Sequence, residues 1–305
     1  MSQLKAAAEA LDALLEQFSR RVSAAGTDVV LDGQRLHQAD ATARVALEVQ
    51  HSGFRRASGA WRPPGRASGD SGWVAHLSSL TRGAHGWEPG YRLTKQGQLE
   101  GPWGSKYAYV SNGTITLYLD EPGQLHPADA HVGDPVAARV PRARENLTPH
   151  RFTLLGGQGG PRPNEARVKL FLGATLEGAT ALVQLLATRA VDPLAFALSV
   201  GNEPRELERA DSVVLDLPPR DEVPVTRLVL DAVRANPGWV RHQPAPLFTR
   251  QVAPGVARAD TRHAADDADG YGWRWSYHLA DAVVKGLRAG ESSPARWRSR
   301  FEGRG

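Results

Sequence analysis

No cysteine occurs among the 305 residues of this chain, which excludes disulfide bonds, thiolate metal sites and cysteine nucleophiles. No apolar run approaches the roughly 20 residues that a membrane-spanning helix needs. The phosphate-binding loop of nucleotide hydrolases, the dinucleotide-binding glycine motif, the zinc-protease helix and the nucleophile elbow are also missing. We therefore expect a cytoplasmic protein with no membrane partner, and chemistry without a cofactor if it is an enzyme.

Histidine and arginine are the residue types that keep a binding function open. The ten histidines are dispersed, with no pair four residues apart on a convincing helix, so we predict no metal site. The net charge is +4 and arginine outnumbers lysine, which favours anionic partners because guanidinium groups bind phosphates through two oxygens. The arginines form no stripe and the aromatic residues form no RNA-binding signature, so we expect no nucleic-acid partner.

Hydrophobic periodicity divides the chain into four parts. We predict an N-terminal helical segment at 1–50, a flexible Gly/Pro/Arg-rich loop at 51–72, a main domain at 73–290 and a basic, frayed tail at 291–305. The loop could close over a peptide or could be a simple insertion.

The main domain mixes short β-prone runs with a few helices. Runs predicted as strands are 107–110, 114–119, 136–140, 152–155, 168–172, 194–200 and 212–217, and predicted helices are 177–187, 223–236 and 276–288. Asn112-Gly113 predicts a tight hairpin between the first two runs. The elements do not alternate as regular βαβ units, so we predict an α+β fold with a mixed, largely antiparallel sheet and flanking helices.

Nine pieces of the sequence, in the same order, resemble the HopA-type effector domain family over roughly residues 75–290. They are GWEPGYR (86–92), SNGTITLYL (111–119), VGDPVAARVPR (132–142), FTLLGGQGGP (152–161), VKLFLGATLEGA (168–179), DPLAFALSV (192–200), RADSVVLDL (209–217), PLFTRQVAPGVARAD (246–260) and YGWRWSYHLADAVVKGL (271–287).

The resemblance implies a phospholyase, the second half of a split dehydratase. In class V lanthipeptide and thioviridamide-like (thioamitide) pathways, a separate kinase-like protein phosphorylates Ser or Thr of a ribosomally made precursor peptide. The lyase then removes the phosphate and leaves dehydroalanine or dehydrobutyrine. The expected partners are thus a phosphorylated precursor peptide and a kinase, and the family also contains secreted virulence effectors. A more distant similarity relates it to the bacterial phosphothreonine lyases.

Elimination of phosphate needs a base for the Cα proton and cations for the leaving group. We nominate Lys169, Arg209 and Arg250 as the phosphate clamp, with Lys169 also a candidate base. Each has a structural alternative: a lysine on a solvent-facing strand, a surface ion pair of Arg209 with Asp211, and simple exposure of Arg250. Second-rank cations and histidines are Arg167, Lys106, His150 with Arg151, and Arg241 with His242. His278 could donate a proton to the phosphate or could be structural.

Ala197 is where this chain departs from the family. The family pattern around PLAFALS carries lysine at this position, and by analogy with the phosphothreonine lyases that lysine would be the base. The substitution could be an engineered base knockout, a natural variant in which Lys169, Lys106 or a histidine has taken over, or the mark of a catalytically impaired homologue. The last would be a scaffold that binds peptide or kinase. Four tryptophans could form a kinase interface or could serve packing: Trp61, Trp73, Trp87 and Trp103.

Overall fold

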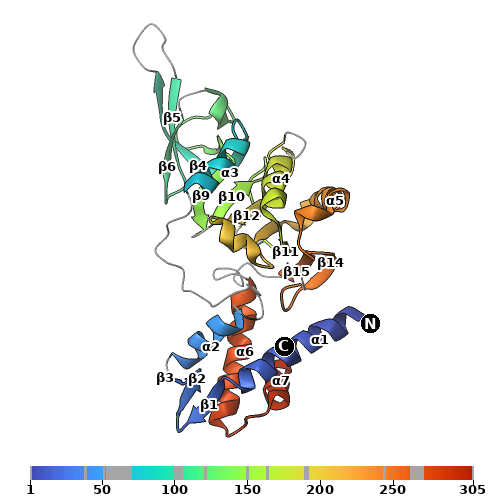
Figure 1. Ribbon diagram of the computed structural model, residues 1–305. Helices are drawn as coiled ribbons and strands as arrows, with labels where there is room; N and C mark the ends of the chain where they lie inside the picture. The colour runs from blue at the N-terminus through green and yellow to red at the C-terminus, as the bar shows by residue number, and fades with distance from the viewer. Residues whose placement is uncertain are drawn as a thin grey trace.

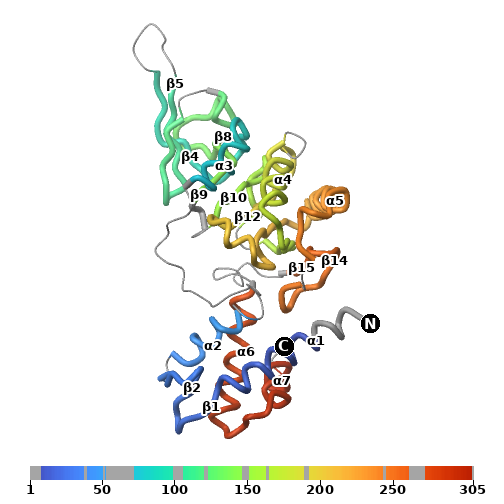
Figure 2. The backbone as a smooth tube through the Cα atoms, viewed as in Figure 1, coloured from blue at the N-terminus to red at the C-terminus, as the bar shows by residue number. Residues whose placement is uncertain are grey.

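The computed structural model describes residues 2–37, 40–50, 52, 71–98, 106–119, 122–148, 151–162, 165–188, 192–242, 245–261 and 271–303 (Figures 1 and 2). The helices are α1 (Ser2–Ser19), α2 (Ala41–Val49), α3 (Ser71–Leu80), α4 (Leu176–Leu186), α5 (Pro219–Ala235), α6 (Tyr271–Arg288) and α7 (Pro294–Glu302), with 3-10 helices η2 (Pro122–Gln124), η4 (Pro204–Glu208) and η5 (Pro237–Trp239). None of these helices is both long enough and apolar enough to cross a membrane. Almost all of the expected loop at 51–72, together with Trp61, Trp103 and His150, lies outside the described residues.

The strands form three antiparallel sheets. They are β1 (Val22–Ala25), β2 (Asp28–Leu31), β3 (Gln34–Leu36), β4 (His85–Gln98), β5 (Lys106–Ser111), β6 (Thr116–Leu119), β7 (Leu125–His126), β8 (Pro135–Pro141), β9 (Ala143–Thr148), β10 (Arg151–Leu155), β11 (Arg167–Leu172), β12 (Ala197–Gly201), β13 (Val213–Leu217), β14 (Arg250–Ala253) and β15 (Val256–Thr261). The orders are β1-β2-β3, β6-β5-β4-β8-β7 and β14-β15-β11-β13-β12-β10-β9. The predicted α+β class is confirmed.

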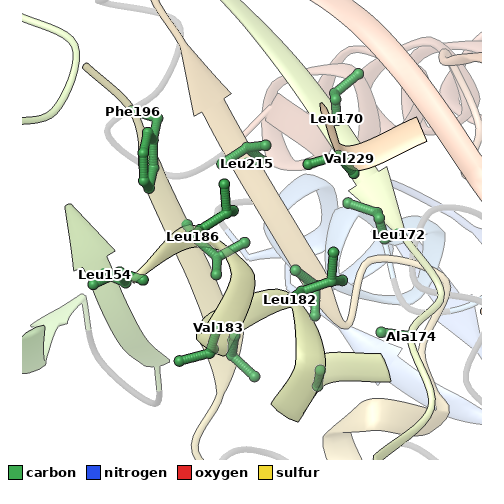
Figure 3. Packing of buried hydrophobic residues seen from close by; sticks show 14 of the residues in the cluster. Leu154, Leu170, Leu172, Ala174, Leu182, Val183, Leu186, Phe196, Leu215 and Val229 are labelled. Atoms are coloured by element: carbon green, nitrogen blue, oxygen red, sulfur yellow. The ribbon is translucent and has the colours of Figure 1, made fainter. Parts of the chain in front are cut away.

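The α-helices α3, α4 and α5 pack on one face of the seven-stranded sheet, and the opposite face, which these three do not cover, is called the helix-free face below. Side chains at alternate strand positions, such as Leu154, Leu170 and Leu215, share one core with Leu182 of α4 and Val229 of α5, as Figure 3 shows. This follows from the period of two in a strand, which sends every second side chain to the same face. The opposite face carries the remaining residues of each strand, and the charged residues discussed below lie there.

Helix α4 is fixed to the sheet by its first turn. The Thr175 side chain accepts a hydrogen bond from the Gly178 N–H, which caps the helix. A Cβ atom on Gly178 would lie 1.9 Å from the Trp239 carbonyl oxygen, so only glycine allows this approach. The following residues Ala179, Leu182 and Val183 recur at helical spacing and are buried.

The Asn112-Gly113 hairpin between β5 and β6 of the five-stranded sheet is confirmed, with Gly113 in the left-handed region at φ +89°.

The five-stranded sheet joins the larger sheet at Arg142. Arg142 follows β8 of this sheet and precedes β9 of the larger sheet, and its side chain is only 1% exposed. Its guanidinium donates to the carbonyls of Leu155 (2.7 Å) and Leu186 (2.6 Å). One side chain thus ties the two sheets and α4 together.

The two ends of the chain form a separate helical body, seen at the bottom of Figure 1. Helices α1, α2, α6 and α7 share a core with β1 and β2, so the segment 1–50 is not purely helical as expected. The tail at 291–305, expected to fray, instead contains α7 because Trp297 is fully buried in this core. Leu247 belongs to the same core. The backbone of Phe248 has a positive φ of +67°, and its ring stacks on that of Trp275 with 5.5 Å between the ring centroids.

Candidate functional site

One row of side chains crosses the helix-free face of the seven-stranded sheet. The strand register pairs Lys169 with Asp216, Asp216 with Ala197, and Ala197 with Leu155. Directly paired residues of antiparallel strands point to the same face. Lys169 lies opposite the core-facing neighbours Val168 and Leu170, as the sequence predicts. The row therefore brings together the candidate base, the position of the missing lysine, and a carboxylate that the sequence prediction did not include.

Lys169 and Asp216 form a buried ion pair. The Lys169 Nζ lies 2.6 Å from the Asp216 Oδ1, and Lys169 is only 6% exposed. The contact is close, but Oδ1 makes no hydrogen bond with acceptable angles, so it is an ion pair rather than a directional hydrogen bond. A carboxylate at this distance stabilises the ammonium form of the lysine. Lys169 is therefore a cation in the resting site.

Two arginines gather at the other end of the same face. Arg209 binds Asp211 through two hydrogen bonds, from Nε to Oδ1 (2.8 Å) and from Nη2 to Oδ2 (2.7 Å), and its Nη1 lies 3.6 Å from Glu206. Arg151 donates to the carbonyls of Ser199 (3.3 Å) and Asp211 (3.1 Å), and lies 3.6 Å from the Asp211 carboxylate. Both guanidinium groups are thus held by the same acid.

Electrostatics confirm that the two arginines act on one another. Burial and the positive charge of Arg209 lower the pKa of Arg151, while Asp211, Glu206 and Asp216 act in the opposite direction. Burial alone would lower the pKa of Arg209, but the charge and hydrogen bonds of Asp211 outweigh it, and the pKa is raised. Both remain charged at neutral pH because arginine starts from a very high value. Asp216 links this cluster to Lys169, since its charge acts on Arg151 as well.

Two hydroxyl groups lie between the lysine row and the arginine cluster. Thr153 pairs with Ser199, one row away from Lys169. The Thr153 hydroxyl is 2% exposed and has no hydrogen-bond partner among the described residues. The backbone from the Leu155 row to Arg151 spans four residues, or about 13 Å at the usual strand rise. The Arg151 guanidinium reaches back to the Ser199 carbonyl, two residues from Ala197, and the charge of Asp216 acts on it, so the face forms one polar strip rather than two separate sites.

A small pocket lies beside the strip. Phe171, two residues after Lys169 on the same strand, lines it together with Pro246, Gln251 and Ala257. Phe171 and Ala257 are directly paired, so the pocket lies on the helix-free face.

Among the described residues, the charges of the strip balance. Three cations (Lys169, Arg151, Arg209) face three carboxylates (Asp216, Asp211, Glu206), as the ion pairs above show. A phosphate entering the strip would compete with these carboxylates for the cations. The arrangement can therefore bind an anion, provided that at least one internal ion pair gives way.

Arg167 is a second-rank candidate that the structure places beside the strip. It lies two residues before Lys169 on β11, on the same face, and its Nη2 lies 3.4 Å from the Arg162 carbonyl oxygen. Arg241 instead donates to the Ala174 carbonyl at 2.9 Å, a structural contact.

Three nominated residues do not join the strip. Arg250 is exposed and pairs with Arg258, which pairs with Leu170, so the register places Arg250 on the helix-covered face. The grouping of Arg250 with Lys169 and Arg209 is therefore wrong. Lys106 is an exposed residue of β5 in the five-stranded sheet. His278 is exposed on α6 in the helical body, beside Trp275 at a ring distance of 6.4 Å.

The two described tryptophans of the expected kinase interface pack within the chain. Trp73 belongs to α3 and is buried in the core, and its Nε1 donates to the Gly201 carbonyl at 3.0 Å. Trp87 lies near His126, at a ring distance of 5.5 Å, and lines a small pocket with Arg142. For Trp73 the packing role is confirmed.

Asp216 and Arg151 are the residues that sequence reasoning missed or ranked low. Asp216 interrupts the apolar run VVLDL, just as Lys169 interrupts VKLFL, and this shared signal was available in the sequence. Their pairing required the register of β11 against β13. Among the described residues, no three His, Cys, Asp or Glu side chains are grouped so that they could hold a metal ion.

Comparisons with known proteins find similarity to effector proteins. The model of the HopA1 effector protein family matches residues 142–300. Two solved structures of effector proteins from Pseudomonas syringae are similar. That of pathovar tomato strain DC3000 has 11% identity and a TM-score of 0.42, covering 88% of this chain and 93% of the effector. That of pathovar syringae strain 61 has 13% identity and a TM-score of 0.46, covering 97% and 94%. No curated protein matches the chain.

Proposed function

The chain belongs to the HopA1 effector protein family, and from this premise we propose that it is a phospholyase. Its substrate is a phosphorylated Ser or Thr of a ribosomally made precursor peptide, and its products are inorganic phosphate and a dehydroalanine or dehydrobutyrine residue. A separate kinase supplies the phosphorylated peptide and forms a complex with the lyase.

The observation that carries the proposal is the clustering of three cations on one sheet face. Lys169, Arg151 and Arg209 come from three distant segments of the chain and meet on the strip. Guanidinium groups grip two phosphate oxygens at once, and a lysine adds a compact charge. A cluster of this kind suits a phosphate that acquires charge as it leaves.

The order of groups along the strip suits the substrate. A phosphorylated side chain laid along it would place its phosphate near Arg151 and Arg209, and its backbone near the row of Lys169 and Ala197. Elimination further needs a group that takes the Cα proton, and the row supplies ionisable side chains at that end.

Conversion of a phosphopeptide tests the proposal. The purified protein is incubated with a phosphoserine or phosphothreonine form of the precursor peptide, with the kinase present, and the peptide mass is followed. Elimination predicts a loss of about 98 Da and the release of one phosphate per dehydro residue. The matched control is Arg250→Ala, which removes an exposed arginine from the other face of the sheet and should leave the rate unchanged. A wild-type protein that releases no phosphate under these conditions would overturn the proposal.

A second candidate function rests on Ala197. The methyl group stands where the related sequences carry their base, and every cation of the strip is already paired, so the chain could bind phosphopeptide without converting it. Such a protein would serve as a scaffold for the peptide and its kinase. Binding without turnover, with stable co-purification of the kinase, would favour this function. In that case Ala197→Lys, which adds an amine next to Asp216, is expected to bring turnover back.

A further inference from the structure

Asp216 is a carboxylate and takes no part in holding the phosphate. It lies in the apolar strand β13, and its side chain is only 16% exposed. A carboxylate in such a place is costly unless it is paired or used in function. Lys169 pairs with it on one side. On the other side its cross-strand neighbour is the methyl group of Ala197.

This position makes Asp216 the direct cross-strand partner of the position of the missing lysine. Ala197 is its direct partner across the strands, whereas Lys169 is one strand further from Ala197. The buried Oδ1 makes only a close ionic contact and no directional hydrogen bond. If Lys169 moves toward a bound phosphate, the Asp216 carboxylate is left beside the methyl group of Ala197 and can accept a proton.

We propose that Asp216 and Lys169 are the acid–base pair of the elimination: Asp216 takes the Cα proton, and Lys169 protonates the leaving phosphate. The inference rests on the proposed phospholyase function and assigns the step that Ala197 leaves open. Carboxylates serve as bases for protons next to a carbonyl group in other enzymes.

The step balances without any other reactant. The electron pair of the Cα–H bond forms the Cα=Cβ double bond, and the electrons of the breaking Cβ–O bond stay on the phosphate oxygen. The Lys169 ammonium gives its proton to that oxygen, so phosphate leaves as HPO₄²⁻, while Asp216 becomes a neutral acid. Asp216 then returns a proton to Lys169 across the 2.6 Å contact, which restores the ion pair.

The arginines make this exchange possible. Arg151 and Arg209 hold the dianionic phosphate at the other end of the strip, and its charge attracts Lys169 away from Asp216. Asp216 is close enough to Arg151 for its charge to affect that group, so the acid, the base and the clamp form one network. Lys169 thus works as an acid, a role that suits its protonated state in the ion pair.

Asp216→Asn tests the pair, because it keeps the shape of the side chain and removes its ability to accept a proton. Phosphoserine peptide turnover is expected to fall by about 100-fold or more, the usual contribution of a general base. Binding of the same peptide, measured by calorimetry, should stay within about threefold of wild type or become tighter, since Lys169 is released for the phosphate.

Three variants guard against a merely structural effect. Asp260→Asn makes the same substitution on β15, where the carboxylate pairs with Arg258 and is mostly exposed, and should leave turnover within about twofold. Asp216→Glu keeps a carboxylate and should recover at least about tenfold of the lost rate. Asp216→Asn combined with Lys169→Met should lose little more than the first change alone, because residues that act as a unit are not additive.

Each outcome decides the matter. Loss of turnover in Asp216→Asn with binding retained, and recovery in Asp216→Glu, supports the pair. A fall in Asp216→Asn turnover of less than about 100-fold overturns the pair and leaves the phospholyase standing. Joint loss of binding and turnover that Asp216→Glu does not restore shows a structural role and also overturns the pair. A wild-type protein without turnover overturns the phospholyase and the pair together.

Discussion

Replacement of Arg142 by alanine should destabilise the whole sheet assembly. The guanidinium is almost fully buried and donates to the carbonyls of Leu155 and Leu186, while its third contact, to Asp192, is longer at 3.3 Å. The Arg142 guanidinium carbon also lies 5.6 Å from the ring centroid of Phe196, the residue that precedes Ala197 in the sequence. Burial lowers the pKa of Arg142, with Asp192 acting in the opposite direction, but the group stays charged at neutral pH.

The size of the effect follows from the groups left behind. Each buried carbonyl that loses its donor costs about 1–3 kcal/mol, so the two carbonyls together account for about 2–6 kcal/mol. The ion pair with Asp192 adds little because that carboxylate is half exposed. We expect Arg142→Ala to lower the free energy of unfolding by about 3–5 kcal/mol, a large share of the usual 5–15 kcal/mol.

Urea denaturation followed by circular dichroism measures this loss. Arg144→Ala is the matched control, because Arg144 lies two residues further along and its ion pair with Glu88 is partly exposed. That control should lose less than about 1 kcal/mol. Equal and small losses in the two variants would refute the reasoning, since they would show that the buried carbonyls find other donors.

Three further predictions concern separate parts of the molecule. Arg209→Ala should weaken phosphoserine peptide binding at least about tenfold in calorimetry, because it removes a bidentate cation; an unchanged affinity would remove Arg209 from the site. Trp297→Ala should cost about 3–5 kcal/mol of stability in urea, because the indole is fully buried; an unchanged midpoint would contradict its role in the core. Burial and Glu88 raise the pKa of Tyr91 from 10.0 to about 12, so the unfolded phenol ionises first. Stability should therefore fall as pH rises through that interval, and Tyr91→Phe should remove this part of the fall.

The sequence is informative where strands and helices bury a continuous apolar pattern. The runs around 168–172 and 212–217 became β11 and β13, and the helices expected at 177–187 and 223–236 became α4 and α5. The short strands β1, β2 and β3 were not predicted, because three or four residues of mixed polarity give no clear period. The helix α7 was not predicted because it is rich in charged residues and has a single buried apolar residue, Trp297, which gives no hydrophobic period.

The candidate site depends on register, which the sequence does not contain. Lys169 stands out as a charge in an apolar strand, and its opposition to Val168 and Leu170 follows from alternation alone. Its pairing with Asp216 joins residues far apart in sequence, so only the order of the strands reveals it. The same register places Arg250 on the helix-covered face, away from Lys169. The presence of an arginine in the sequence does not tell which face of the sheet it lies on.

The shared core of the chain ends has a consequence for folding during synthesis. Residues of α1, β1 and α2 leave the ribosome before the sheets do, but their apolar side chains pack against α6 and α7, which leave it after the sheets. The sheets, which lie between them in sequence, can complete their own cores earlier. Translation thus leaves the first 50 residues with exposed apolar surface for most of its duration, a period in which a chaperone would find its binding site there.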